Sequence, residues 1–98
     1  MPNGVLIRKL KFDGTVRRTW EADLVDGDGA WLVAHADAAR HGATKDGRPT
    51  DAAAHSVFFL ATARPLTVVF EFDALGRFLG AQCDAAFPAA IDGRTLSF

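Results

Sequence analysis

Five of the first 20 residues are basic and suited to binding an anion: Arg8, Lys9, Lys11, Arg17 and Arg18. Asp13 is the only acidic residue in this segment, so residues 1–20 have a formal net charge of +4. Residues 21–98 have a formal net charge of −5. Arginine can donate two hydrogen bonds to phosphoryl oxygens, and lysine binds phosphate as a point charge. One or two of these cations are therefore candidates for a phosphate site. The alternative is a solvated edge hairpin whose charges discourage aggregation.

Three aspartates near the ends of predicted strands are candidate ligands for a hard divalent cation: Asp73, Asp84 and Asp92. Such cations prefer carboxylate oxygens, although no ligand spacing as diagnostic as a calcium loop is present. Asp73 and Asp92 stand in turn sequences, where aspartate commonly serves the turn itself. Asp84 instead follows Cys83 at the end of a predicted strand and precedes no tight Asp-Gly turn, so the turn interpretation does not extend to it.

The other chemically active residue types give weaker signals. The three histidines, His35, His41 and His55, lack the spacing that places two ligands on one helix, so a zinc site has no support. Cys83 is the only cysteine, and its strand context favours a small buried residue over a nucleophile. No phosphate-binding glycine loop, dinucleotide fingerprint or nucleophile-elbow motif occurs, which excludes enzymes of those classes.

Short apolar runs between turn signals must position these side chains. The predicted strands are residues 5–12, 15–25, 30–34, 56–61, 66–73, 77–84 and 94–98, and residues 36–40 are a candidate helical turn. Asp13-Gly14 is a hairpin signal, and 45–49 is a second sharp turn. Strands at hairpin spacing with little helical periodicity predict an all-β fold, either a small antiparallel barrel or a strongly curled sheet.

Length and composition fit one globular domain over residues 1–98. The chain is 49% hydrophobic and 23% charged, with a formal net charge of −1. This balance excludes a binder that relies on strong positive charge, so we expect no nucleic-acid partner. No apolar run reaches the ~20 residues of a membrane helix. With no secretory signal and one cysteine, the expected location is the cytoplasm, away from membranes.

Residues 7–20 resemble the opening of a bacterial family first catalogued as a domain of unknown function. Its members include nucleoside tri- and diphosphatases of Gram-positive bacteria and the cytidylyl-phosphonate hydrolase of fosfomycin biosynthesis. The matching positions are Lys11, Asp13, Gly14, Arg18 and Trp20. Residues 72–80, Cys83-Asp84 and Pro88 resemble the central hairpin and the loop after it, and residues 95–98 resemble the approach to an acidic strand.

The resemblance implies a β-barrel that cleaves phosphoanhydride bonds of nucleoside di- or triphosphates with a divalent cation (Mg, Mn or Co). It assigns the metal to Asp84 and the phosphates to Arg18 and Lys11. The family's run of alternating aspartates and its C-terminal helices do not occur before Phe98. The alternative is therefore a catalytically incomplete β domain that binds a ligand or a partner, with the cation absent. Whether the chain is an enzyme stays open, and no catalytic residue is assigned. A homodimer paired through an edge strand is a further expectation.

Overall fold

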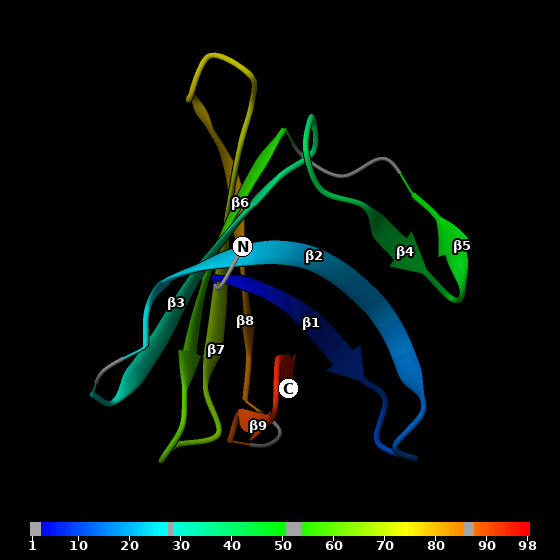
Figure 1. The fold of residues 1–98 in the computed structure, drawn as a ribbon, viewed down its shortest axis with the longest axis vertical. Helices are drawn as coiled ribbons and strands as arrows, with labels where there is room; N and C mark the ends of the chain where they lie inside the picture. The colour runs from blue at the N-terminus through cyan, green and yellow to red at the C-terminus, as the bar shows by residue number, and fades with distance from the viewer. Residues whose placement is uncertain (1–2, 28, 51–53, 86–87) are drawn as a thin grey trace.

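Ten strands and no helix make up the described part of this computed structural model, residues 3–27, 29–50, 54–85 and 88–98 (Figure 1). The strands are β1 (Gly4–Leu10), β2 (Val16–Asp26), β3 (Trp31–Asp37), β4 (Ala43–Lys45), β5 (Arg48–Pro49), β6 (His55–Ala61), β7 (Thr67–Phe72), β8 (Phe78–Asp84), β9 (Ala90–Asp92) and β10 (Thr95–Ser97). The seven strands predicted from the sequence are all present. The three additional strands are β4, β5 and β9.

All ten strands belong to one sheet, with the order β8-β7-β6-β3-β2-β1-β10-β9 and with β4 and β5 attached to β2. The sheet curls, and β1 and β2 arch over the other strands in Figure 1. The predicted all-β curled sheet is confirmed, and it is not closed into a barrel. The pairing of β1 with β10 is parallel, so the sheet is mixed rather than purely antiparallel.

Two Asp-Gly sequences form the turns that the sequence predicted. Lys11 and Thr15 close the β1–β2 hairpin, and Gly14 adopts a φ of 86° that glycine tolerates without strain. Asp46 and Gly47 have φ values of 52° and 78°, which is the geometry of a type I′ hairpin turn. The second turn joins β4 to β5, and β4 pairs with residues 18–20 of β2 while β5 pairs with β4.

The core lies on the inner face of the curl, where alternate side chains of successive strands meet. Trp20 of β2 packs edge-on against Phe58 of β6, with ring centroids 4.9 Å apart, and it stacks at 6.3 Å on Phe98. Ile7, Phe58 and Leu60 are completely buried. Because strand side chains alternate between faces, the residues beside these core positions point outward.

The outer face of β6, β7 and β8 carries an aromatic cluster of Phe59, Phe70, Phe72 and Phe78. The ring centroid of Phe70 lies 5.7 Å from that of Phe59 and 6.5 Å from that of Phe78. The centroids of Phe72 and Phe78 are 6.0 Å apart. Phe78 remains 61% exposed. This side of the sheet is thus apolar yet only partly covered in the described chain.

Candidate functional site

Four cations form a row across four adjacent strands at one end of the curl. Lys9 of β1 lies directly opposite Arg18 of β2, Arg18 lies opposite Lys45 of β4, and Lys45 lies opposite Arg48 of β5. Directly opposed residues project from the same face of a sheet. Arg18 is two residues before Trp20 on β2, and Lys9 is two residues after Ile7 on β1. Both cations therefore project from the face that carries Trp20 and Ile7. The row therefore continues the buried inner face toward solvent.

Arg18 is the most constrained cation of this row. Its guanidinium carbon lies 4.8 Å from the centre of the Trp20 ring, close enough for a cation–π contact. Its Nε is buried and has no hydrogen-bond partner among the described residues. An unpaired buried donor costs about 1–3 kcal/mol. An anion bound here would supply the missing acceptor.

Asp84 joins this row from the opposite end of the sheet. Its Oδ2 lies 3.4 Å from Nζ of Lys9, and both side chains are mostly buried, with exposed fractions of 32% and 23%. Asp84 is on β8 and Lys9 is on β1, and the strand order places four strands between them: β7, β6, β3 and β2. The ion pair therefore crosses the curl. It places one carboxylate beside the cation that neighbours Arg18.

Thr67 provides a second buried polar atom near Asp84. It lies directly opposite Asp84 in the pairing of β7 with β8, so both side chains project from one face. Thr67 is 1% exposed, and its Oγ1 has no partner among the described residues. Two partnerless buried atoms, one on Thr67 and one on Arg18, thus lie on the same inner face.

The predicted site residues are only partly brought together. Arg18 and Asp84 both neighbour Lys9, whereas Lys11 pairs with Asp46 at 3.7 Å beside the β1–β2 hairpin. Lys9 was one of the five basic candidates, but the family resemblance assigned the phosphates to Arg18 and Lys11. Register was the missing information. The pairing of β1 with β2 skips Arg17 between Lys9 and Leu10, and β1 ends at Leu10, so Lys9 lies opposite Arg18 and Lys11 has no partner in this pairing.

The donor set limits what cation Asp84 can hold. The described residues contain no group of three or more His, Cys, Asp or Glu side chains able to bind a metal ion. A single carboxylate fits Mg²⁺ only where substrate phosphates and water complete the coordination, which is a common arrangement for Mg²⁺ in nucleotide sites. Asp84 therefore fits a cation that arrives with phosphates.

Asp73 serves a turn, as its sequence context indicated. Its Oδ1 accepts hydrogen bonds from the backbone N–H groups of Arg77 and Leu75, and its Oδ2 accepts one from Nε of Arg77 at 2.8 Å. The Arg77 N–H bond is the main reason that the pKa of Asp73 lies below its ordinary value. Asp92 ends β9 on the exposed surface.

The histidines and the cysteine lie away from the row. Nε2 of His35 lies 3.0 Å from Nδ1 of His55, and Nε2 of His41 lies 3.5 Å from Oδ2 of Asp23. Cys83 is exposed, so the prediction of a buried cysteine is wrong. The reason is that Cys83 lies on the face opposite Asp84, on a strand that ends the sheet.

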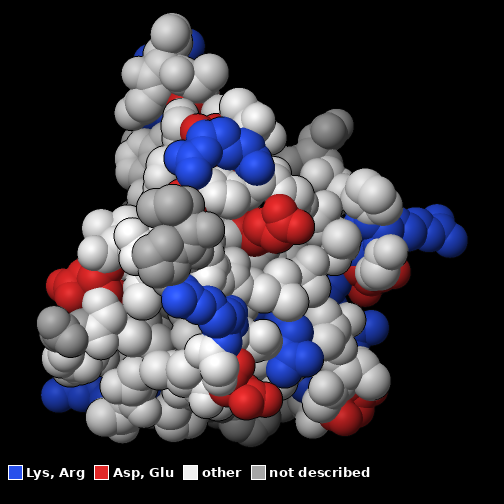
Figure 2. All heavy atoms as spheres, viewed as in Figure 1, with Lys and Arg blue, Asp and Glu red and all other residues white. Residues whose placement is uncertain are grey.

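Surface charge is otherwise mixed. Basic and acidic side chains are interspersed over the face shown in Figure 2, and neither sign covers it. Local geometry, rather than net charge, must then distinguish the row of cations from the rest of the surface.

No protein-family model matches this sequence, and no curated protein is significantly similar to it. In the described part of the chain there is no helix that is both long and apolar enough to cross a membrane.

Proposed function

We propose that this domain binds the phosphate chain of a nucleoside di- or triphosphate, or of a related phosphoanhydride, along the row of cations and hydrolyses the anhydride. The observation that supports the proposal is the alignment of Lys9 and Arg18, with Nε of Arg18 buried and unpaired among the described residues. Neighbouring strands lie about 4.8 Å apart, so a chain of two or three phosphate groups meets more than one cation. Each contact would be a charge-assisted hydrogen bond.

Asp84 would hold a divalent cation that the phosphates share. When bound, such a cation withdraws charge from phosphoryl oxygens and lowers the barrier to attack by water. Lys9 has a separate role in the proposal, because its ammonium group contacts Asp84 and also lies next to Arg18. It would orient the carboxylate while offsetting phosphate charge.

The first prediction compares two lysines of the basic cluster. The wild-type protein is expected to release phosphate from nucleoside di- and triphosphates in the presence of Mg²⁺, Mn²⁺ or Co²⁺. Lys9→Gln removes a charged contact of about 1.5–3 kcal/mol, so kcat/KM should fall roughly 10- to 100-fold. Lys11→Gln should change kcat/KM less than about threefold, because Lys11 lies outside the row and pairs with Asp46.

A phosphate-release assay on the folded proteins measures both effects. Absence of activity with every metal and nucleotide, together with absence of nucleotide binding, would overturn the proposal. A larger loss in Lys11→Gln than in Lys9→Gln would move the site to the hairpin.

A second candidate function is self-association without catalysis, and the exposed edge of β8 favours it. The last strand is not an edge, because β10 is paired on one side with β1 and on the other with β9. The ends of the strand order are β8 and the three-residue β9, and the two-residue β5, which pairs only with β4, is a further short edge. Residues 78–83 carry no charge and no proline, the usual guards against edge pairing, and Leu79 is 60% exposed.

The second prediction therefore concerns pairing of β8 with β8 of a second copy. If this edge dimerises, the wild-type protein should sediment as a dimer at micromolar to millimolar concentration, and Leu79→Lys should make it monomeric. Leu75→Lys is the matched control, since Leu75 is 77% exposed but lies in the turn before β8. A wild-type protein that stays monomeric throughout this range would exclude the dimer.

A further inference from the structure

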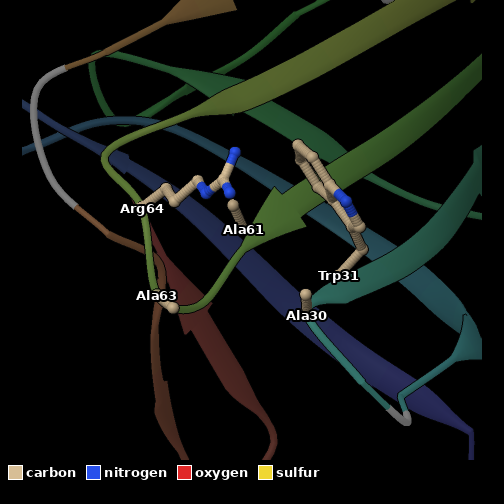
Figure 3. Close-up of a pocket in the computed structure, with 5 residues that line it drawn as sticks. All are labelled: Ala30, Trp31, Ala61, Ala63 and Arg64. Carbon is tan, nitrogen blue, oxygen red and sulfur yellow. The ribbon is translucent and has the colours of Figure 1, made fainter.

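A small pocket lies where β3 begins and β6 ends, and its walls come from two side chains of opposite character (Figure 3). It has a volume of about 170 Å³ and is lined by Ala30, Trp31, Ala61, Ala63 and Arg64. In Figure 3 the Arg64 side chain points toward the indole of Trp31.

Strand register explains why this space is open. Trp31 lies directly opposite Ala61 in the pairing of β3 with β6, so the largest side chain faces one of the smallest. The chain then turns back, with the N–H of Ala61 bonded to the carbonyl of Leu66. The N–H of Thr62 is bonded to the carbonyl of Ala30, which ties this loop to the start of β3. Backbone hydrogen bonds thus hold Arg64 beside the indole.

Arg64 is a cation without a described partner. Its guanidinium makes no hydrogen bond or ion pair with any residue that the structure describes, whereas Arg40 pairs with Asp23 and Arg77 with Asp73. None of the lining residues is acidic. The guanidinium is planar and can donate two parallel hydrogen bonds, a geometry that matches a carboxylate. The remaining lining is an indole and three methyl groups, which suits an apolar ring.

The volume sets the size of that ring. An apolar cavity of about 150 Å³ holds a benzene molecule. A pocket of about 170 Å³ therefore takes one six-membered ring with a small substituent, and it is too small for a nucleotide. Stacking on the indole favours an aromatic ring, and the charge of Arg64 disfavours a cationic one.

We propose that the pocket between Trp31 and Arg64 binds a monocyclic aromatic carboxylate, with the ring on the indole and the carboxylate on the guanidinium. This site is independent of the phosphate proposal. Trp31 precedes the buried Leu32 and faces outward, whereas Lys9 and Arg18 share the inner face.

The third prediction uses benzoate as the probe, titrated into the folded protein and followed by the amide and indole N–H signals in NMR spectra. Benzoate should bind saturably, with a roughly millimolar Kd typical of a ligand with nine non-hydrogen atoms. Signals of residues 30–31 and 61–64 should shift. Benzylamine, which reverses the charge, and acetate, which lacks the ring, should each bind at least about fivefold more weakly.

One variant removes the guanidinium, a second fills the pocket, and a third provides the control. Arg64→Gln should weaken benzoate binding about tenfold, because it removes the charged hydrogen bonds. Ala63→Leu should also abolish binding by filling the pocket, and its exposed position means that the fold should tolerate it. Arg17→Gln removes an exposed cation elsewhere and should leave the Kd unchanged.

Non-saturating shifts would overturn the proposal. Equal binding of acetate and benzoate would also overturn it, since the pocket would then contribute nothing beyond a surface charge. Unchanged benzoate affinity in Ala63→Leu would place the ligand outside the pocket.

Discussion

Replacing Phe58 with alanine is expected to lower the free energy of unfolding by about 3–5 kcal/mol, a typical cost for removing a buried phenylalanine. Phe58 is completely buried, and its ring packs edge-on against Trp20. Domains usually have only about 5–15 kcal/mol of total stability. This one substitution should therefore remove a large share of the stability. Urea denaturation of the variant and the wild type measures the difference.

The next residue along β6 provides a matched control. Phe59→Ala makes the same chemical change on the opposite face of the strand, where Phe59 is partly exposed and contacts Phe70 at 5.7 Å. Its cost should be less than half that of Phe58→Ala, since less apolar area is lost and solvent can fill the space. A Phe59→Ala variant as unstable as Phe58→Ala would show that the outer aromatic cluster is buried too. Such a result would require a covering partner.

The main strands and the two Asp-Gly turns were predictable because they depend on local sequence. Alternation of apolar and polar residues marks a half-buried strand, and Asp-Gly supports the positive φ of a hairpin turn. The strands that were missed, β4, β5 and β9, have only two or three residues each. Runs of that length show no period. The parallel pairing of β1 with β10 joins residues almost 90 positions apart and arises from the curl of the whole sheet.

The residue types of the candidate site were predictable from the sequence, but which individual residues come together there was not. Arg18 and Asp84 were selected from the sequence, and both lie next to Lys9 in the structure. The choice between Lys9 and Lys11 depended on the cross-strand pairing, which puts Lys9 opposite Arg18 and which no local pattern indicates. The burial of Thr67 was also not predictable. An isolated threonine at the start of a strand does not indicate that its hydroxyl is buried without a partner.

Replacing Arg18 with methionine should affect binding and stability in opposite directions. The variant removes a buried Nε that has no described partner, and it keeps an unbranched side chain able to pack against Trp20. The free energy of unfolding should stay the same or rise by about 1 kcal/mol. Affinity for pyrophosphate with Mg²⁺ should fall about 10- to 100-fold, since a charged contact to phosphate is lost.

Urea denaturation and calorimetric titration of pyrophosphate measure the two quantities on the same samples. Arg17→Met is the matched control on the neighbouring position of β2, where the side chain is exposed, and it should change neither quantity by much. A structural arginine would behave differently, because its loss would lower stability while any binding persisted. If Arg18→Met unfolds more easily and still binds pyrophosphate, the guanidinium stabilises the fold through Trp20 and has no part in recognition. Loss of binding without loss of stability would instead mean that this residue is retained at a cost to the fold, as expected for a functional site.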